Sequence, residues 1–378
     1  MARIGIDARF FGSLGKGLGR YTQKLIENLE RIDRENQYVV FLRKDNFDEY
    51  VPKNPNFHKV LADYRWYTFS EQLFFPRLLK KHDLDLVHFP HFNVPLLYRR
   101  KIVVTIHDLI LLHFPTLRST TLSPIWYWIK YLAYKWVIGS AVSRARHILT
   151  VSEFTKKDIL EHYSKAKNKI SVTYEACENG QEKERKNDSQ IIRKYGIMKP
   201  YLLYVGNAYP HKNLERLIDA FGQLLQGNPE LMLVLVGKED YFYGRLKAYA
   251  RAKGIASVIF AGFVPDDELG QFYADAQAYV FPSLYEGFGL PPLEAMKELV
   301  PVICSNHECM QEILGDAAYF VDAHSQNELA NGLDEVLANE KLRQALVEKG
   351  KKQIKKYSWE KMAQDTLAAY VLAVKKQK

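Results

Sequence analysis

The alternation of short apolar runs with helical patterns constrains the fold of this chain more than any other feature. In the first half, β-branched and aliphatic runs end in loops and are followed by stretches whose apolar residues recur at helical spacing. The runs are RIGID, YVVFL, DLVHF, IVVTIHD, HILTVS and ISVTY. Because parallel strands need a crossover connection between them, this rhythm predicts βαβ units and a parallel sheet.

The rhythm restarts in the second half with the runs YLLYVG, LMLVLVG, VIFAGF, AYVFPS and VPVICS. Between the halves, residues 178–190 lose almost all apolar character, which is typical of a solvated connection. The 378 residues also exceed the length of roughly 250 at which single cores stop growing. We therefore predict an α/β protein of two Rossmann-like domains, 1–177 and 178–357, followed by an amphipathic helix in 358–378 that Ser358 caps.

The composition says more about the cellular location of the protein and its partners than about any reaction that it catalyses. The cysteines Cys177, Cys304 and Cys309 lack the spacing of a zinc site or a disulfide framework, so we expect core thiols. The segment after Met1 lacks the apolar core of a secretory signal, which favours a cytoplasmic location. The formal charge of +9 attracts nucleic acid, anionic lipid or a phosphorylated ligand alike. Because both signs of charge are dispersed and no recognised module is present, we expect no nucleic-acid partner.

The segment FPSLYEGFGLPPLEAM carries the strongest chemical signal. A strand ends at Ser283, a Gly-Phe-Gly turn follows and Pro291-Pro292 begins a helix, so that Glu286 in the loop and Glu294 in the first helical turn can face one ligand. Carboxylates accept paired hydrogen bonds from hydroxyl groups, which suits sugars and ribose. Either carboxylate alone would more often be a solvated loop residue or a complement to the helix dipole.

With Glu286 and Glu294 separated by seven residues, this segment resembles the signature of retaining glycosyltransferase family 4. The resemblance implies the GT-B architecture, in which two Rossmann-like domains with parallel sheets face each other across a cleft and a C-terminal helix crosses back to the N-terminal domain. It also implies a retaining, metal-independent hexosyltransferase with the nucleotide-sugar donor on the C-terminal domain and the acceptor on the N-terminal domain. His107, Lys212 and Glu286 would form the catalytic set, and Lys212 with helix amides would stabilise the departing diphosphate.

The resemblance also assigns individual donor contacts. Glu286, with the backbone amides of Phe288 and Gly289, would contact the donor sugar, and Glu294 would hold the ribose hydroxyls. The loop of Phe263 and Val264 is similar to the one that receives the nucleotide base, although core packing would equally explain Phe263. The full set of expected donor-binding residues is Gly17, Gly19, Gly206, Asn207, Lys212, Phe263, Val264, Glu286, Gly287, Phe288, Gly289, Leu290 and Glu294.

The segment YVGNAYPHKN is the expected diphosphate site. A strand ends at Gly206 and Lys212 precedes a helix, so that a cation and free amides converge on one point. A lone lysine would more often be a surface residue near a helix cap, but the resemblance favours diphosphate binding. Many family members place an arginine directly after this glycine, where this chain has Asn207. His211 and Lys238 are the alternatives for the missing positive charge.

A glycine-rich loop follows the first predicted strand. Gly15, Gly17 and Gly19 lie between this strand and the first helix, and they resemble the family loop that faces the donor phosphate and the acceptor, with Arg20 on the acceptor side. A flexible connection without a ligand would have the same composition, and the full spacing of a dinucleotide fingerprint is absent.

The strand IVVTIHD ends in His107 and Asp108, and open α/β sheets bind ligands at the carboxyl ends of their strands. A lone histidine is more often structural, but His107 resembles the family histidine beside the donor sugar, and Asp108 would either orient it or face the acceptor. Ser152 and Glu153 also resemble residues that line the family's cleft. Because a helix cap has the same pattern, they stay outside the catalytic set.

Two patterns suggest metal sites that we do not expect. Asp83-Leu84-Asp85 mimics the Asp-x-Asp motif of the other large glycosyltransferase fold, yet it precedes a strand and so belongs at the edge of the sheet away from ligands. His88 and His91 have a spacing compatible with zinc but no cysteine or glutamate partner nearby, which favours loop packing or cleft lining. We therefore expect neither a metal nor a cofactor.

Residues 124–138, PIWYWIKYLAYKWVI, mix aromatic and aliphatic side chains with Lys130 and Lys135. The lysines argue against a transmembrane span. Two interpretations stay equal: an amphipathic helix on an anionic membrane, and a buried helix whose lysines reach solvent. Membrane contact would bring the protein to the inner face of the plasma membrane and to a lipid-linked acceptor.

The segments GIDAR, HDL and SLYEGFGLPPLEAM together look most like bacterial mannosyltransferases of cell-surface glycan assembly. The expected donor is GDP-mannose, with a UDP-sugar left open, and the expected acceptor is a glycan or a lipid-linked glycan. The alternatives are a nucleotide-sugar epimerase or phosphorylase of the same fold, and a non-enzymatic anion-binding scaffold.

Overall fold

The computed structural model of this protein describes residues 1–12, 16–116, 118, 120, 123–177 and 190–375. Their internal contacts divide the chain into two units. Unit 1 comprises Met1–His113, Ser123–Glu175 and Ser358–Lys378, and unit 2 comprises Phe114–Leu122 and Ala176–Tyr357. Of the solvated connection predicted at 178–190, residues 178–189 lie outside the described part of the chain.

Unit 1 is built on a parallel sheet. Within the described residues its strand order is β3-β2-β1-β4-β5-β6-β7, and all neighbours pair in parallel. The strands are β1 (Arg3–Asp7), β2 (Gln37–Leu42), β3 (Phe57–Leu61), β4 (Leu86–Phe89), β5 (Ile102–Ile106), β6 (His147–Thr150) and β7 (Ile170–Val172). The order changes direction between β1 and β4, and the carboxyl ends of strands beside such a switch point are where open sheets bind ligands.

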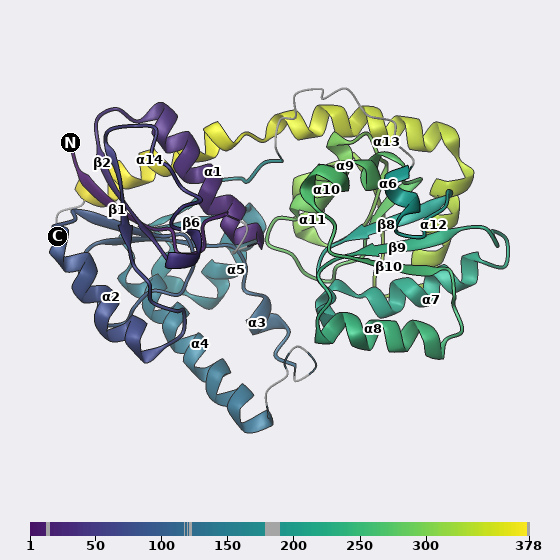
Figure 1. The fold of residues 1–378 in the computed structure, drawn as a ribbon, viewed down its shortest axis with the longest axis horizontal. Helices are drawn as coiled ribbons and strands as arrows, with labels where there is room; N and C mark the ends of the chain where they lie inside the picture. The colour runs from purple at the N-terminus through teal and green to yellow at the C-terminus, as the bar shows by residue number, and fades with distance from the viewer. Residues whose placement is uncertain (13–15, 117, 119, 121–122, 178–189, 376–378) are drawn as a thin grey trace. The chain divides into compact units, whose positions relative to one another are not determined.

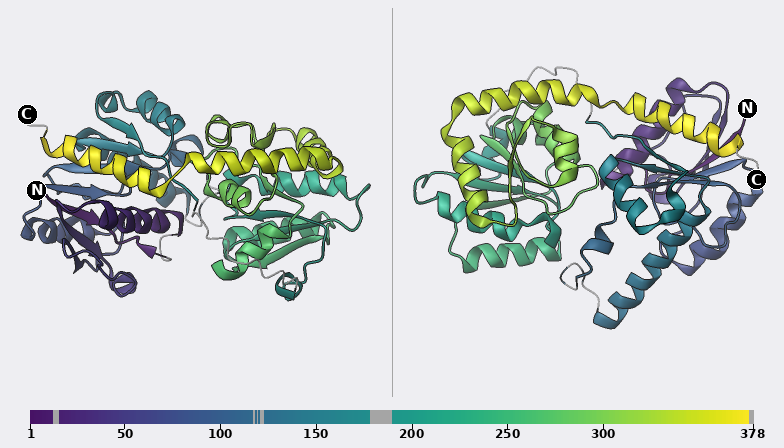
Figure 2. Two further views of the ribbon diagram at one scale, coloured as in Figure 1. Left: turned by 90° about the horizontal axis from the view of Figure 1, so that it is seen from above. Right: turned by 180° about the vertical axis from the view of Figure 1, so that it is seen from behind.

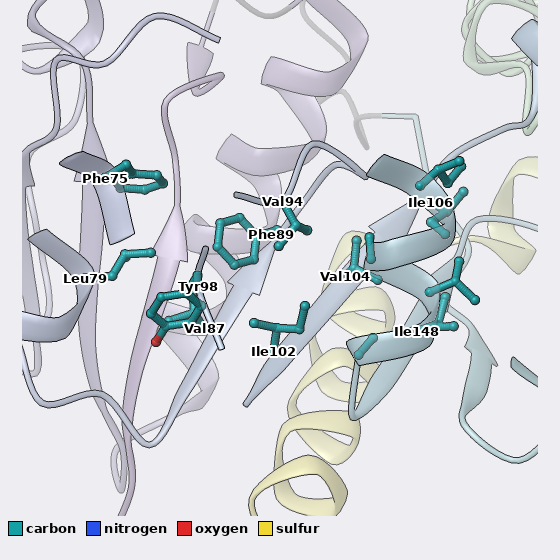
Figure 3. Close-up of a cluster of buried hydrophobic side chains, with 14 of the residues drawn as sticks. Phe75, Leu79, Val87, Phe89, Val94, Tyr98, Ile102, Val104, Ile106 and Ile148 are labelled. Atoms are coloured by element: carbon teal, nitrogen blue, oxygen red, sulfur yellow. The ribbon is translucent and has the colours of Figure 1, made fainter. Parts of the chain in front are cut away.

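Helices cover both faces of this sheet (Figure 1). They are α1 (Lys16–Ile32), α2 (Phe69–Lys81), α3 (Ile110–His113), α4 (Pro124–Arg144), α5 (Glu153–His162) and α14 (Trp359–Lys375). Helices α2, α4 and α5 contribute to one core, where Phe75 and Leu79 of α2 gather with side chains of β4 and β5 (Figure 3). On α1, Tyr21, Leu25 and Leu29 recur every four residues and are fully buried, which is the apolar stripe of an amphipathic helix.

The C-terminal helix α14 belongs to unit 1, where it packs along α1, as all three ribbon views show (Figures 1 and 2). Its Tyr370 hydroxyl lies 2.6 Å from Nδ1 of His88 on β4. Lys101 Nζ donates to the carbonyl of Val374 at 2.9 Å. The last helix therefore returns to the unit that the N-terminal residues form, as expected of the GT-B architecture.

Unit 2 repeats the plan of unit 1. In the part of unit 2 that the structure describes, the sheet has the order β10-β9-β8-β11-β12-β13 and is parallel throughout. The strands are β8 (Tyr201–Val205), β9 (Met232–Val236), β10 (Val258–Gly262), β11 (Ala278–Phe281), β12 (Val302–Ser305) and β13 (Ala318–Val321). Here the switch point lies between β8 and β11.

The helices of unit 2 also cover both faces of its sheet. They are α6 (Gln190–Arg193), α7 (Leu214–Leu224), α8 (Tyr241–Ala252), α9 (Asp266–Ala274), α10 (Leu290–Lys297), α11 (Glu308–Leu314), α12 (Gln326–Ala338) and α13 (Glu340–Gln353). Helices α7 and α8 share one face with α12, whereas α9, α10 and α11 lie on the other (Figure 1). Cys177, Cys304 and Cys309 lie buried as thiols, as expected.

The structure divides the first half of the chain differently from the sequence. The prediction placed all of 1–177 in the first domain, but Phe114–Leu122 groups with unit 2 by its contacts. Within unit 2, Arg118 donates two hydrogen bonds of 2.6 and 2.8 Å to the carboxylate of Glu215 on α7. A short connection between two helices carries no periodic pattern, so this pairing could not be predicted from the sequence.

Candidate active site

A lysine–glutamate ion pair marks the switch point of unit 2. Lys212 ends a short 3-10 helix (Pro210–Lys212) between β8 and α7, and Glu286 lies between β11 and α10. Lys212 Nζ donates to Glu286 Oε1, and the two side chains are only 12% and 11% exposed. The structure thus brings together two members of the expected catalytic set at the carboxyl ends of the strands that flank the switch point.

Glycines lie along the same edge of the sheet. Gly206 follows β8, Gly237 follows β9 and Gly262 ends β10. The Gly206 N–H donates to Val236 O and the Gly237 N–H to Gly262 O, both at 2.9 Å. A Cβ on Gly237 would lie 2.1 Å from the Gly206 carbonyl, so this position excludes a side chain. Gly237 was not singled out from the sequence, although its place after an apolar run repeats that of Gly206.

The turn that contains Glu286 is buried up to the start of α10. Gly289 has a φ of 90°, and a Cβ there would come 2.7 Å from Met310, so glycine is required. Gly287 and Phe288 are also buried, whereas Leu290 and Glu294 are partly exposed on one face of α10. Tyr273 donates from its hydroxyl to Glu294 Oε2 at 3.2 Å. Glu294 is therefore accessible to a ligand, although the turn before α10 is buried.

His211 does not supply the second cation of the diphosphate site. Burial and the neighbouring charge of Lys212 lower the pKa of His211 to about 4, although Glu286 opposes the shift. The imidazole is therefore neutral at pH 7. The carbonyl of Asn207 accepts a hydrogen bond from Tyr204 at 2.7 Å. Of the two alternatives for the missing charge, only Lys238 stays, and it is exposed directly after Gly237.

The two residues of the loop expected to receive the base, Phe263 and Val264, differ in exposure. Val264 is buried, but Phe263 is 69% exposed. The alternative that Phe263 serves only to pack the core is therefore wrong. The exposed ring is free to stack on a planar ligand.

In unit 1, His107 is hydrogen-bonded at both ring nitrogens. Its Nδ1 lies 3.0 Å from Glu175 Oε1, and its Nε2 lies 3.0 Å from the carbonyl oxygen of Pro90. Both partners are acceptors, so both nitrogens must carry a proton. Burial alone would lower the pKa of His107, but Glu175, the Pro90 carbonyl and Asp108 outweigh it and raise the pKa above its ordinary value. These contacts therefore favour the imidazolium form of His107.

Glu175 was missed in the sequence, although it follows the last strand of the unit just as His107 follows β5. Glu175 is thus a second carboxylate beside the ring, and the charge of Asp108 also raises the pKa of His107. Asp108 Oδ1 accepts the N–H at the start of α3 at 3.0 Å. Ser152 accepts from the N–H of Thr155 at 3.0 Å and so caps α5, which is the interpretation that kept it outside the catalytic set.

Gly17 and Gly19 lie in the first turn of α1 and not in a loop before it, which corrects the prediction from the sequence, and their surroundings differ. A Cβ on Gly19 would lie 2.1 Å from the Gly12 carbonyl, so α1 can pack on the preceding loop only with glycine there. At Gly17 a Cβ would meet nothing within 4 Å, and this residue is exposed. Arg20 is partly buried on α1. Gly15 lies outside the described residues. Gly17 is thus the better candidate for a ligand contact.

A buried charge cluster in unit 1 was not anticipated. Arg9, which follows β1, is fully buried and lies 2.7 Å from both Asp7 Oδ1 and Glu71 Oε1. Asn93 donates to the same Glu71 oxygen at 2.8 Å. The cluster joins the loop after β1 to α2. Its members are 62 residues apart in the sequence, so spacing alone could not reveal them.

Both motifs that mimic metal sites have structural partners. His88 lies 2.8 Å from Thr105 Oγ1 as well as bonding Tyr370, and burial with the charge of His107 lowers the pKa of His88 to about 3. Asp85 accepts the N–H of Arg3 at 2.8 Å, ahead of β4 and therefore at the amino edge of the sheet. These contacts give His88 and Asp85 structural roles.

Helix α4 exposes an apolar stripe. Its buried side chains are Tyr127, Tyr134, Ile138, Ala141 and Val142. Its exposed large apolar side chains are Ile125, Trp126, Trp128, Ile129, Leu132 and Trp136. A fully buried helix is therefore the wrong interpretation, since only one face is covered. In the described part of the chain, no helix combines the length and hydropathy needed to cross a membrane.

A basic pocket of about 490 Å³ lies at the C-terminal end of α4. Its cationic lining residues are Arg144, Arg146, Lys165, Lys167 and Lys169, and none of the described lining residues is acidic. Ser143, which also lines the pocket, lies two helical turns beyond Trp136 and so continues the exposed stripe.

Comparisons with known proteins agree with this architecture. The model of Glycosyltransferase Family 4 matches residues 15–177, and the model of Glycosyl transferases group 1 matches residues 187–353. O-antigen chain mannosyltransferase B of Escherichia coli is 28% identical, over 94% of this chain and 96% of the relative. O-antigen chain mannosyltransferase RfbU of Salmonella typhimurium is 27% identical, over 82% of this chain and 84% of the relative. Sucrose-phosphate synthase from Thermosynechococcus elongatus shares the fold, with a TM-score of 0.77 and 18% identity over 98% of each chain.

Proposed function

Because this chain belongs to glycosyltransferase family 4 and has the GT-B fold, we propose that it is a retaining mannosyltransferase that moves mannose from GDP-mannose to a glycan or a lipid-linked glycan. The two relatives described above are mannosyltransferases of O-antigen chains. These matches do not favour an epimerase, a phosphorylase or a non-enzymatic scaffold. The observation that carries the proposal is the Lys212–Glu286 ion pair at the switch point of unit 2.

The ion pair suggests how the donor is received. When a diphosphate arrives beside Gly206 and Gly237, Lys212 can exchange Glu286 for a phosphate oxygen, since both are anionic acceptors. Glu286 is then released to accept hydroxyl hydrogen bonds from the donor sugar, while Glu294 accepts those of the ribose. Lys212 stabilises the charge that develops on the departing diphosphate, so we propose that transfer needs no metal.

His107 acts in this proposal as a positive charge, because Glu175 and the Pro90 carbonyl already occupy both of its ring nitrogens. An imidazolium protonated at both nitrogens cannot take a proton from the acceptor. We assign no carboxylate as a covalent nucleophile. The acceptor therefore attacks on the face that the diphosphate leaves, and a phosphate oxygen takes its proton, which retains the configuration.

The exposed face of α4 supports peripheral contact with an anionic membrane. Trp and aliphatic side chains from Ile125 to Trp136 offer an apolar surface to the lipid interface, and Lys130 and Lys135 are exposed on the same helix. The basic pocket at its C-terminal end complements anionic headgroups. Such contact would present unit 1 to a lipid-linked acceptor.

Turnover tests the proposal directly. The full-length protein is incubated with GDP-mannose labelled in the sugar, or with UDP-glucose, and a mannan oligosaccharide acceptor, with and without EDTA. We expect label transfer from GDP-mannose, resistance to EDTA and an α-anomeric product from the α-linked donor. Transfer only from UDP-glucose would refute the mannose assignment, loss with EDTA would refute metal independence, and a β-anomer would refute retention.

A further inference from the structure

We infer that His113, Asp158 and His162 form a binding site for a divalent transition-metal cation such as Zn²⁺, outside the donor site, which joins α3 to α5 in unit 1. His113 is the last residue of α3, and Asp158 and His162 lie four residues apart on α5. Such spacing places two side chains on one face of a helix. One ligand atom from each of the three residues lies within 4.8 Å of the others.

The distances suit a tetrahedral cation. His113 Nε2 lies 2.8 and 2.9 Å from the two carboxylate oxygens of Asp158, and His162 Nδ1 lies 3.1 Å from Oδ1. Ligand atoms around Zn²⁺, with bonds of about 2.0–2.1 Å, are roughly 3.3 Å apart. The two nitrogens therefore need to move only slightly away from the carboxylate, and all three ligand atoms already lie within 4.8 Å of one another. The two imidazole rings already lie edge to face, with centroids 5.3 Å apart.

The burial of the three side chains and the types of their ligand atoms indicate which cation would bind. The Asp158 side chain is 5% exposed, whereas those of His113 and His162 are 34% and 37% exposed, so a buried negative charge sits beneath two imidazoles that solvent can reach. Two nitrogens and one oxygen favour Zn²⁺ and its neighbours in the first transition row over Mg²⁺ or Ca²⁺, which prefer oxygen. Three protein ligands leave a fourth position for water.

Metal binding must compete with protons. His162 Nδ1 also lies 2.9 Å from the carbonyl oxygen of Asp158, and this hydrogen bond must be given up when Nδ1 binds the ion. Zn²⁺ therefore has to displace a hydrogen bond of the ring as well as its proton.

A cation bound at this site would restrain α3, which lies close to His107 in the sequence. This helix has four residues, none of them buried, and it begins directly after Asp108 and Leu109. Its His113 contacts Asp158 of α5, and its Leu112 packs against the core of unit 1. A cation shared by α3 and α5 would fix the segment that follows His107.

Zinc titration of the untagged, full-length protein, stripped with a chelator and desalted, tests the site. We expect calorimetry to show one Zn²⁺ per chain, Co²⁺ to give the visible absorption of tetrahedral coordination, and Zn²⁺ to raise the thermal midpoint. His162→Ala and Asp158→Asn should bind Zn²⁺ at least tenfold more weakly. His58→Ala, at an exposed position on β3 of the same unit, is the matched control and should bind like the wild type.

The inference is wrong if His162→Ala keeps the zinc affinity of the wild type, or if the wild type binds no Zn²⁺ below about 1 mM. His162 is exposed, so His162→Ala should fold, and its circular dichroism spectrum verifies this. Where Asp158→Asn does not fold, His162→Ala decides the outcome. Nucleotide binding is measured on the same samples and should be unchanged in His162→Ala, which separates this site from the donor site.

Discussion

Glu175 holds His107 in its charged form, with Glu175 Oε1 3.0 Å from Nδ1 while the Pro90 carbonyl occupies Nε2. The two side chains come from loops after β5 and β7, which are separated by β6 in the sheet. Lys212 and Glu286 form the corresponding pair in unit 2. Each unit therefore places a cation bonded to a carboxylate at the carboxyl ends of its strands.

We expect Glu175→Gln to lower the pKa of His107. The pKa of His107 is raised in the fold, so the pair stabilises unit 1 fully below the ordinary imidazole pKa of about 6.5, and this contribution is lost as the pH rises through the raised value. Unfolding measured from pH 5 to pH 9 should show the stability difference between wild type and variant shrinking as the pH increases. The ring protons of His107, followed by NMR, should titrate at a lower pH in the variant.

Asp108→Asn is the comparison for this experiment, because the charge of Asp108 raises the pKa of His107 less than the hydrogen bond and the charge of Glu175 do. It should shift the pKa of His107 less than Glu175→Gln does. Equal shifts in the two variants, or no shift in Glu175→Gln, would contradict the assignment of Glu175 as the residue that positions His107.

The alternation of strands and helices was sufficient to predict the two parallel sheets, because each βαβ unit has its own periodic signature. Lys212, Glu286 and His107 all follow strands, but the resemblance to the family was needed to single them out as site residues. Glu175 follows a strand as well, but recognising its partner requires the order of strands within the sheet. The role of Gly19 depends on the way α1 folds back on the residues just before it, and the Asp7–Arg9–Glu71 cluster joins segments distant in sequence, and no local pattern encodes either.

Gly17 and Gly19 should differ in how much stability the protein loses when each is replaced by alanine. Gly19→Ala places a Cβ against the backbone carbonyl of Gly12, which cannot move like a flexible side chain, so we expect a loss of about 1–3 kcal/mol in the free energy of unfolding. Gly17→Ala meets no atom and should cost less than about 1 kcal/mol, since alanine favours the helix. Urea denaturation distinguishes them, and equal losses would contradict the structural role of Gly19.

Arg9→Met should leave the carboxylates of Asp7 and Glu71 buried without their cation. We expect a loss of about 3–5 kcal/mol in the free energy of unfolding, measured by denaturant titration. Arg100→Met removes an exposed partner of Asp83 and should cost less than about 1 kcal/mol. A loss below about 1 kcal/mol in Arg9→Met would show that the cluster does not stabilise unit 1.

Helix α4 should bind anionic membranes through its exposed aromatic side chains. Replacement of both Trp126 and Trp136 by serine should weaken binding to vesicles of phosphatidylglycerol at least tenfold, measured by sedimentation. Leu372→Ser removes an exposed apolar side chain from α14 and is the control. Wild-type binding to neutral phosphatidylcholine vesicles that equals binding to anionic ones would contradict a role for the basic pocket.

Calorimetric titration of GDP, UDP and ADP, each with and without Mg²⁺, tests the central claim that unit 2 holds a sugar nucleotide at its switch point. We predict that GDP binds without Mg²⁺, and that Lys212→Ala and Glu294→Ala each weaken it at least tenfold. Lys349→Ala, on the exposed surface of the same unit, should bind like the wild type. If no nucleotide binds, or if Lys212→Ala and Glu294→Ala bind GDP as tightly as the wild type, the proposed donor site is wrong.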